Sequence, residues 1–537
     1  MPVQKLFYGG DIITCEDEND KPDALLIENG LIKYVGQYEK AIQLSNDPEI
    51  VCLNGRTLMP AFIDPHSHFS WMANSMQGVS LQDAECFSDI GDLLTKHISE
   101  TKPESSSIVF GYCYDYTVLR EKKHPTKELL NRVSADIPIY IVHVSMHMGV
   151  ANDAALALCG IDSTKKDPQG GLIGRAGKSL EPNGYLEETA HMEAFGILTS
   201  KVKIDPVTAL DSAQKLYVKN GITTVQEGAA SDQTIKVLKI YSSRKFLKID
   251  VVAYPLVKDR LPDVILSNPA YVNKYVDRFK IGGCKLMLDG SPQAKTAWLT
   301  KPYENSGDYC AYPILEDEQV VEYAKAAIDN NLQVLAHCNG DAASDQFINC
   351  YEKALGSSDN LNKDNLRPVM IHYQTVRDDQ LDKMVNLKML PSIFVGHVYY
   401  WGDVHMENLG ADRGSRISPA KSAQNKGLCI NFHQDSPVTK PNMLHTIWCA
   451  VNRVSRSGQV IGFDQSVDVY SALKAVTINA AYAYFEEDKK GSLKEGKLAD
   501  LVILDKNPLT IDKMEIKDIS VLETFKEGQT VWKLDNS

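Results

Sequence analysis

The chain has 537 residues, of which 43% are hydrophobic and 24% charged, and its formal net charge at pH 7 is −13. This acidic balance argues against a nucleic-acid partner, because phosphate binding needs a basic surface. The sequence has no run of about 18 apolar residues that would span a membrane. The eleven cysteines form no Cys-x-x-Cys pair, and the first five residues lack the pattern of a secretory signal. We therefore expect a cytoplasmic protein with reduced thiols.

Both ends of the sequence are typical of β-structure. Near the N-terminus, residues 7–14, 24–30 and 31–36 are predicted as strands, and Asn29-Gly30 is a hairpin turn signal because both residues tolerate positive φ. Near the C-terminus, residues 491–493, 499–504, 521–525 and 529–532 are again predicted as strands. We therefore expect residues 1–58 and 486–537 to form one small β-domain.

Between residues 59 and 485, strand-like segments alternate with amphipathic helical segments. The predicted strands are residues 108–111, 137–142, 223–226, 249–254, 284–288, 332–336, 368–371 and 428–432, and the clearest helices are residues 317–330, 341–355 and 378–387. This alternation predicts a parallel sheet covered by helices, and strands that end in polar clusters favour a closed barrel. An insertion at about residues 75–210, rich in Gly and Pro, is predicted to form a lid or cap.

Two histidines follow the apolar run of residues 58–63. If that run is a strand, His66 and His68 point the same way with adjacent imidazoles. Two neutral imidazoles at a strand end make half of a divalent-metal site. The alternative is a pair of surface histidines at the edge of a loop.

Later predicted strands end in further groups that could bind a metal, namely Lys285, His337, His372 and Asp435. The recurrence of such groups in one structural context favours a metal site over histidines that merely edge a core. A buried Lys285 would be costly without a partner, but a buried lysine deprotonates readily. Its neutral amine can add carbon dioxide and become a carbamate that bridges two cations. The alternatives are a lysine that reaches the barrel rim or one that pairs with Asp289.

Several of these segments together resemble a known family. Residues 59–68 resemble the first-strand motif of the amidohydrolase superfamily, and residues 337–341, 371–374 and 434–438 resemble segments of its family 3 branch, which includes N-substituted formamide deformylases. Residues 170–175 and 184–188 are similar to the insertion of that branch, and residues 496–502 to its closing β-domain. The resemblance implies an α/β fold, a distorted (β/α)8 TIM barrel over residues 59–485 with a β-sandwich built from both termini.

The resemblance also implies a ligand set. His66, His68 and Asp435 would bind one metal, His337 and His372 a second, and a carbamylated Lys285 would bridge them. In this superfamily a metal-bound hydroxide attacks an amide-like carbonyl, and the last-strand aspartate, here Asp435, carries the proton to the leaving group. Zinc suits this mixture of ligands best, manganese or iron being alternatives. Some relatives hold one metal, so one or two ions per chain are expected.

Four more residues are predicted to contact substrate, namely His147, His397, Arg413 and His433. For each of them the alternative is a structural role in packing. Cys338, next to His337, is a candidate nucleophile whose alternative role is that of a small buried hydrophobe.

The sequence thus predicts a metal-dependent hydrolase. Its expected reaction is cleavage of a carbon–nitrogen bond other than a peptide bond, in a small amide, N-formyl or N-acyl compound. Hydrolysis of an ester or lactone at the same site is one alternative, and a non-catalytic binding protein that keeps the barrel is another. A homodimer is expected from the resemblance alone.

Overall fold

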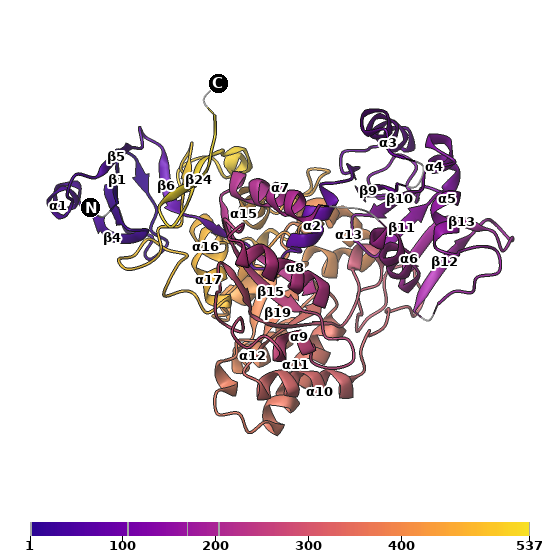
Figure 1. Ribbon diagram of the computed structural model, residues 1–537. Coiled ribbons are helices and arrows are strands. Elements are labelled where there is room, and N and C mark those ends of the chain that lie inside the picture. Colours follow the sequence, from indigo (N-terminus) through magenta and orange to yellow (C-terminus); the bar gives the residue numbers. More distant parts are fainter. Residues whose placement is uncertain (1–2, 105–106, 169, 202–204, 536–537) are drawn as a thin grey trace. The chain divides into compact units, whose positions relative to one another are not determined.

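The computed structural model describes residues 3–104, 107–168, 170–201 and 205–535, which fall into two compact units (Figure 1). The first unit contains Met1–Phe69, Gln214–Ser436 and Lys440–Ser537, and the second contains Ser70–Ala213 and Pro437–Thr439. The insertion expected at about residues 75–210 thus falls within the second unit. Among the described helices, none has both the length and the apolar composition needed to cross a membrane.

Two sheets of the first unit are built from the ends of the chain. One has the order β4-β3-β1-β5, with β1 (Gln4–Tyr8), β3 (Ala24–Glu28), β4 (Leu31–Gly36), β5 (Glu49–Cys52) and the helix α1 (Tyr38–Leu44) beside it. The other has the order β2-β6-β22-β23-β24, with β2 (Asp11–Ile12), β6 (Thr57–Pro60), β22 (Leu501–Leu504), β23 (Val521–Lys526) and β24 (Gln529–Lys533). Strand β6 pairs antiparallel with β22, so the indigo and yellow parts of the ribbon lie side by side (Figure 1).

Local sequence explains how these two sheets form. The β3–β4 hairpin turns at Asn29 and Gly30, whose φ angles of 53° and 84° are positive, as predicted. Apolar side chains from both termini share one core, in which the rings of Phe7 and Phe525 meet edge to face at 5.4 Å. Residues 491–493, predicted as a strand, are irregular here.

The first unit also contains a succession of parallel strands. They are β7 (Phe62–Ile63), β14 (Ile222–Ala230), β15 (Asp250–Pro255), β16 (Phe279–Ile281), β17 (Gly283–Met287), β18 (Gln333–Cys338), β19 (Val369–His372), β20 (Leu390–Ile393) and β21 (Asn431–Phe432). They form two sheets, β16-β15-β14-β7 and β17-β18-β19-β20-β21, in which every pairing is parallel.

Further main-chain contacts connect these two parallel sheets. Only Gly282 separates β16 from β17, and a parallel bridge joins Leu256, after β15, to Lys285 in β17. At the other edge, the N–H of Asp435 donates to the carbonyl of His66 (3.3 Å), and the N–H of His68 donates to that of Ser436 (2.8 Å). The segment after the last strand is therefore bonded to the segment after the first.

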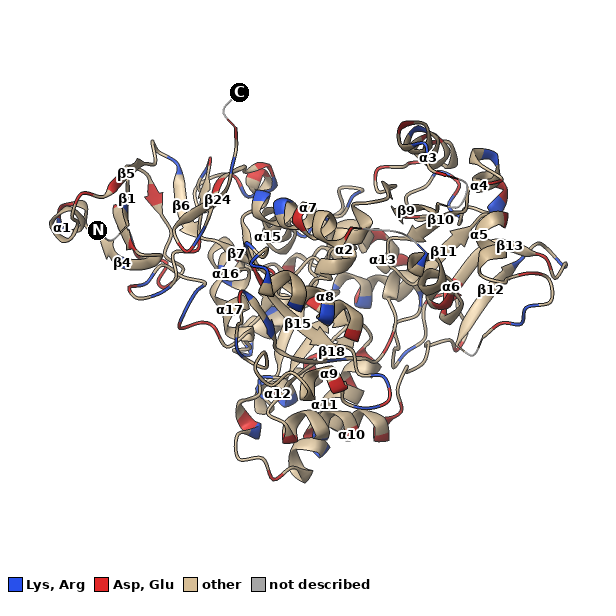
Figure 2. Cartoon of the chain, viewed as in Figure 1, with Lys and Arg blue, Asp and Glu red and all other residues tan. Residues whose placement is uncertain are grey.

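Helices follow most of these strands. Their bounds are α7 (Pro206–Lys219), α8 (Asp232–Ser243), α9 (Asp263–Leu266), α10 (Asp317–Asp329), α11 (Asp341–Ser357), α12 (Asp378–Asn386), α13 (His397–Ser415), α14 (Ala420–Asn425), α15 (Met443–Asn452), α16 (Val469–Ala475) and α17 (Ile478–Ala483), with short 3₁₀ turns η1 (Pro292–Ala294), η2 (Lys363–Asn365), η3 (Phe463–Gln465) and η4 (Lys513–Asp518). Helices α10, α11 and α12 begin at the predicted residues. Charged residues concentrate on helices and loops, whereas the parallel strands are mostly uncharged (Figure 2).

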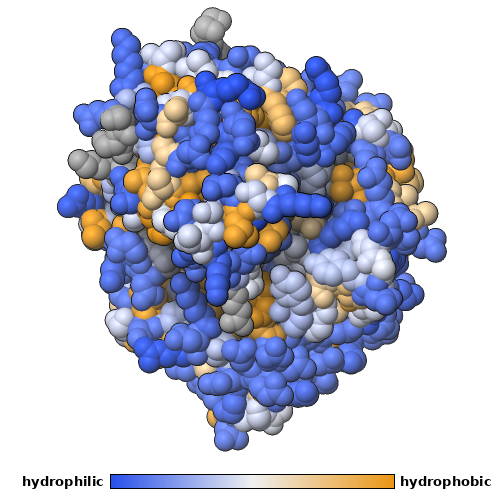
Figure 3. All heavy atoms as spheres, turned by 90° about the vertical axis from the view of Figure 1, so that its right-hand side faces the viewer, coloured by the Kyte–Doolittle hydropathy of each residue, from blue (hydrophilic) through white to orange (hydrophobic). Residues whose placement is uncertain are grey.

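The second unit has a six-stranded sheet of its own, in the order β12-β13-β11-β10-β9-β8. Its strands are β8 (Val79–Ser80), β9 (Val109–Tyr114), β10 (Ile139–His143), β11 (Met148–Ala151), β12 (Gly171–Arg175) and β13 (Pro182–Glu188), and its helices are α2 (Phe69–Ser75), α3 (Phe87–Thr101), α4 (Lys127–Val133), α5 (Asp153–Leu158) and α6 (Thr189–Ser200). The face shown in Figure 3 is mainly hydrophilic, with hydrophobic groups interspersed.

Three sequence-based expectations about strands need correction. Residues 108–111 and 137–142, grouped above with the barrel strands, belong to the sheet of the second unit, because any strand buried on both faces gives the same apolar run. The run of residues 58–63 is divided between β6 in a terminal sheet and β7 in a parallel sheet. Strand β20 was missed because its sequence, Leu-Pro-Ser-Ile, contains a proline that argues against a strand.

Candidate metal centre

The predicted ligands all lie in the first unit, at or near the carboxyl ends of its parallel strands. His66 and His68 follow β7, Lys285 is in β17, His337 in β18, His372 ends β19, and Asp435 follows β21. In parallel strands these ends share one edge of the structure, which is where side chains from distant parts of a chain converge.

Three of these residues already meet at metal-ligand spacing. The Nε2 atoms of His66 and His68 each lie 3.3 Å from Oδ1 of Asp435. A tetrahedral zinc site with bonds of about 2.0–2.1 Å separates neighbouring ligand atoms by about 3.3 Å. One ligand atom each from His66, His372 and Asp435 also lies within 4.8 Å of the other two. The donor set and its spacing therefore fit a divalent ion.

The other predicted ligands adjoin this group. The imidazole centroids of His337 and His372 are 4.3 Å apart, and those of His66 and His372 are 5.5 Å apart. The backbones of His372 and Asp435 adopt φ of 75° and 55°, the left-handed region that non-glycine residues rarely occupy. Each such residue costs about 1–3 kcal/mol, and these strained residues cluster at functional sites.

Hydrogen bonds on the far side of the rings orient the histidines. Nδ1 of His66 lies 2.6 Å from Oε1 of Gln226, and Nδ1 of His68 lies 2.7 Å from the carbonyl of Gly228. Nδ1 of His337 lies 3.1 Å from Oδ1 of Asp289. Because each acceptor is an oxygen, Nδ1 carries the proton and Nε2 keeps its lone pair for a ligand.

The sequence-based prediction that His66 and His68 are adjacent agrees with the structure, where their centroids are 5.2 Å apart. The predicted reason was wrong, because β7 ends at Ile63 and neither histidine lies in a strand. Their directions come instead from the bonds to Gln226 and Gly228 in β14. Sequence reasoning missed Gln226 as an orienting group, although a glutamine inside an apolar strand was a visible signal.

Electrostatics keep two of these imidazoles, those of His66 and His372, neutral and the carboxylate of Asp435 ionised. Burial, followed by the neighbouring Lys285, lowers the pKa of His66 far below its usual range, and burial with His337 does the same for His372. Burial alone would raise the pKa of Asp435, but the surrounding histidines, His66 first, outweigh it and lower that pKa. Neutral imidazoles beside an ionised carboxylate are what a divalent ion requires.

Lys285 is buried among these groups. Its side chain is 1% exposed, and Nζ has no hydrogen-bond partner in the described part of the chain. Burial lowers the pKa of Lys285 to about 7, against the opposing effects of Asp435 and Cys338. Much of the amine is therefore neutral near pH 7. Nδ1 of His372 and Oδ1 of Asp435 are likewise buried without a hydrogen-bond partner among the described residues.

Asp289 does not pair with Lys285, which corrects one of the alternatives considered for that lysine. Its carboxylate binds Nδ1 of His337 and accepts from the main-chain N–H groups of Trp298, Asn339 and Gly340, at 2.6–3.1 Å. A carboxylate held this firmly fixes the orientation of His337. The other alternative, a lysine that reaches the rim, conflicts with the burial of Lys285.

Two of the predicted substrate-contacting residues lie close to the cluster or to its neighbours. His433 is fully buried, and its ring centroid is 4.9 Å from that of His66 and 5.3 Å from that of His372. Burial lowers the pKa of His433 to about 3. His397 is also buried, and its Nδ1 lies 3.1 Å from Nε2 of His405.

The other two predicted residues have polar partners of their own. The guanidinium of Arg413 donates to the carbonyls of Lys301 (3.0 Å) and Pro302 (2.7 Å), so it anchors a loop. His147 belongs to the second unit, where its Nδ1 lies 2.9 Å from Oε2 of Glu188.

Cys338 has the environment of a buried apolar residue. It is fully buried, and burial followed by the carboxylate of Asp289 raises the pKa of its thiol well above the usual range. A thiol that stays protonated is a poor nucleophile, which supports the packing role.

Comparisons with known proteins agree with this chemistry. A model of the amidohydrolase family matches residues 49–532. N-substituted formamide deformylase of Arthrobacter pascens is 24% identical, with 97% of each chain covered, and putative amidohydrolase YtcJ of Bacillus subtilis is 24% identical over 99% of this chain and all of YtcJ. Protein LONG AFTER FAR-RED 3 of Arabidopsis thaliana is 27% identical over 98% of this chain and 91% of its own.

Solved structures share the fold. An uncharacterized metal-dependent hydrolase from Pyrococcus horikoshii has a TM-score of 0.77 and 26% sequence identity, and the match covers 95% of this chain and 99% of that one. A second, from Pyrococcus furiosus, has a TM-score of 0.75 and 24% identity, with 94% and 100% of the two chains covered.

Proposed function

Because the chain belongs to the amidohydrolase family, we propose that it is a metal-dependent hydrolase that cleaves a carbon–nitrogen bond in a small amide, N-formyl or N-acyl compound, and not a peptide. The observation that carries this proposal is the convergence of the His66 and His68 Nε2 atoms on Oδ1 of Asp435, each at 3.3 Å. The similarity to an N-substituted formamide deformylase supports the substrate class.

The proposal includes the finer architecture. The eight successive strands, with β16 and β17 counted as one, would close into a distorted (β/α)8 barrel. The hydrogen bonds of Asp435 and Ser436 with the segment after β7 support closure. Residues 1–58 and 486–537 would form one β-sandwich domain, supported by the pairing of β6 with β22.

The proposed ligands are divided between two zinc ions. His66, His68 and Asp435 would hold one, His337 and His372 the other, and a carbamate on Lys285 would bridge them. The pKa of Lys285, near 7, supports carbamate formation, because only a neutral amine adds carbon dioxide. When bound, such ions lower the pKa of water from 15.7 to about 7 and polarise the substrate carbonyl.

The residues of the chain would then perform the proton transfers. Water adds to the carbonyl carbon, the carbon–nitrogen bond breaks, and the departing nitrogen needs a proton. Asp435 is the proposed carrier: its Oδ1 lies 3.3 Å from Nε2 of His66 and of His68, and its Oδ2 lies 4.0 Å from Nδ1 of His372. Its Oδ2 would accept the proton of the attacking water and deliver it to the nitrogen.

Metal analysis and a substrate panel test this function. Protein purified without chelators or a histidine tag is expected to contain about two zinc ions per chain by plasma mass spectrometry. It should then hydrolyse N-formyl and N-acyl amines faster than matched esters and lactones. A preference for the esters would favour an esterase, and inertness of the metal-loaded protein towards all three classes would favour a binding protein.

A further inference from the structure

A cavity of the first unit lies at the ends of the parallel strands opposite to the candidate metal centre. Its volume is about 780 Å³, and its wall includes Asp250 and Gln333, the first residues of β15 and β18. His337 lies four residues further along β18, a distance of about 13 Å at 3.3 Å per residue. The cavity is therefore separate from the candidate metal centre.

The wall of this cavity contains more cationic side chains than carboxylates. Its wall contains five cationic side chains, Lys274, Arg278, Lys280, Lys489 and Lys490, but only three carboxylates, Asp250, Glu486 and Glu527. The cavity therefore carries an excess of two positive charges within a chain whose net charge is −13.

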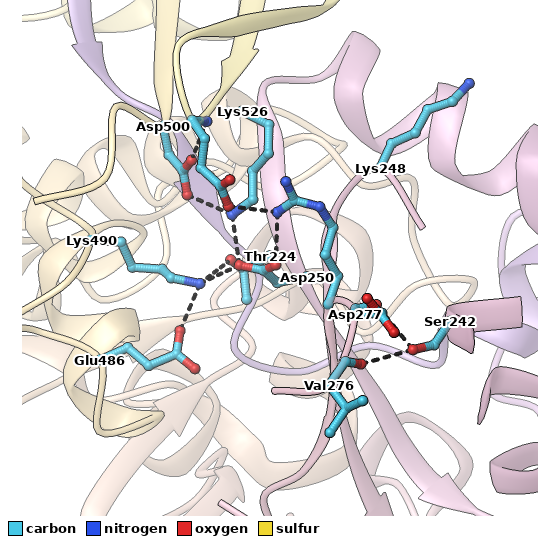
Figure 4. Close-up of polar contacts among 12 residues, drawn as sticks. Thr224, Ser242, Lys248, Asp250, Val276, Asp277, Glu486, Lys490, Asp500 and Lys526 are labelled. Carbon is cyan, nitrogen blue, oxygen red and sulfur yellow. Dashed lines mark hydrogen bonds and ion pairs between the residues drawn. The ribbon is translucent and has the colours of Figure 1, made fainter. Parts of the chain in front are cut away.

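Three of the cations are neutralised by the three carboxylates. Lys490 binds Asp250 (2.5 Å) and Glu486 (2.8 Å), with its amine between the two carboxylates (Figure 4). Arg278 binds Asp250 (3.2 Å) and Glu527 (2.8 Å), and Lys280 binds Glu486. Behind this wall, Lys526 connects Asp250 (2.6 Å) to Asp500 (2.7 Å) (Figure 4).

The excess charge therefore belongs to Lys274 and Lys489. Both side chains are exposed, and within the described ranges neither forms an ion pair. Two lysines at a concave, partly apolar wall concentrate the electric field and attract anions.

The rest of the wall offers apolar surface and a hydrogen-bond donor. Tyr275, Phe485 and Leu366 contribute side chains, and the volume suits a ligand larger than an inorganic ion. The hydroxyl of Tyr275 is buried and has no hydrogen-bond partner among the described residues. Burial, then the carboxylates of Glu486 and Asp250, raise the pKa of Tyr275, so the hydroxyl keeps its proton and can donate it.

We propose that this cavity binds a small organic phosphate monoester. The phosphate dianion would contact Lys274 and Lys489, whose two charges match its own, and the hydroxyl of Tyr275 would donate to the same ligand. Lysine is a common phosphate binder, in which the ammonium acts as a point charge. The organic part would pack against Phe485 and Leu366. This site is independent of the proposed hydrolysis.

Calorimetric titration of the metal-loaded, full-length protein with phenyl phosphate tests the proposal. Saturable binding is expected, tighter than for inorganic phosphate and absent for phenol, and raising the salt concentration should weaken it. The double variant Lys274→Ala/Lys489→Ala should lose about tenfold or more in affinity. Because both lysines are exposed, the variant is expected to fold, which its melting temperature would verify.

Two controls distinguish this cavity from other sites. The variant Lys166→Ala/Lys178→Ala removes the same number of charges from exposed positions of the second unit and should bind phenyl phosphate as the wild type does. Tyr275→Phe keeps the ring and should bind severalfold more weakly. Failure to bind phenyl phosphate, or equal binding by the Lys274→Ala/Lys489→Ala variant, would overturn the proposal. Binding that disappears on chelation would do so too, by placing the phosphate at the metal centre. Hydrolytic activity is measured separately, so either proposal can fail alone.

Discussion

The imidazole of His66 is held by the side chain of Gln226, whose Oε1 lies 2.6 Å from Nδ1 of the histidine. The amide nitrogen of Gln226 donates in turn to the carbonyl of Pro65 (2.6 Å) and to the hydroxyl of Tyr484 (3.2 Å). The carbonyl of Pro65 can only accept, so the amide nitrogen must face it and Oε1 must face His66, which specifies that Nδ1 of His66 carries the proton.

Replacing Gln226 by leucine should therefore weaken metal binding. Loss of an orienting partner of this kind typically costs about 10–100-fold in metal affinity. Competition with a zinc chelator of known affinity measures the change. Gln214→Leu is a matched control, because Gln214 is equally buried but binds Tyr241 and the carbonyl of Phe246. Equal affinities for the two variants would show that Gln226 does not orient a ligand.

Lys285→Ala should sharply lower both metal content and activity, because it removes the amine that would carry the bridging carbamate. Lys285→Met, which fills the same volume, should behave alike and thereby separate the loss of the amine from the loss of packing. Metal content per chain is measured by plasma mass spectrometry, with bicarbonate present throughout. An unchanged metal count in both variants would remove Lys285 from the site.

The buried ion pairs around Asp250 should be essential for stability. Asp250→Asn leaves the ammonium groups of Lys490 and Lys526 buried without their shared carboxylate, which costs about 3–5 kcal/mol of unfolding free energy. In contrast, Asp382→Asn breaks an exposed pair with Lys426 and should cost about 0–1 kcal/mol. Urea denaturation compares the two variants. Equal and small losses would contradict the importance assigned to this network.

His405 should make stability depend on pH. It is fully buried, and burial lowers its pKa to about 3, whereas an unfolded histidine titrates near 6.5. Below pH 6.5 the unfolded chain binds a proton at His405 that the folded chain does not bind. The contribution of His405 to the free energy of unfolding is therefore complete above pH 6.5 and falls as the pH decreases towards 3. Between pH 7.5 and 5.5 the wild type should lose about 1.4 kcal/mol more than His405→Phe. Parallel pH profiles in denaturant titrations would refute this.

The sequence was informative where a local pattern determines a structure. The Asn29-Gly30 pair predicted the first hairpin, and helices α10 to α12 begin at the expected aspartates. The family resemblance is confirmed by the match over residues 49–532. The six proposed ligands were predicted from the recurrence of polar groups at strand ends and from the family resemblance, and the structure places all six in the first unit.

Other features depend on long-range contacts that no local pattern contains. Asp289, just after β17, orients His337, and Gln226 in β14 orients His66 across 160 residues of sequence. The apolar run of residues 58–63 gives no sign that β6 and β7 belong to different sheets, because strands buried on both faces have the same apolar composition. Residues 108–111 were assigned to the wrong sheet for the same reason.

The bonds between His66 and Asp435, and between His68 and Ser436, connect positions almost 370 residues apart. A chain truncated before residue 431 would lack both the last strand and the carboxylate, and a chain still being synthesised would lack them too. If the proposed ligands are correct, zinc cannot bind with full affinity until the first and last strands have met. Metal uptake would then be a direct signal that the first and last strands have come together.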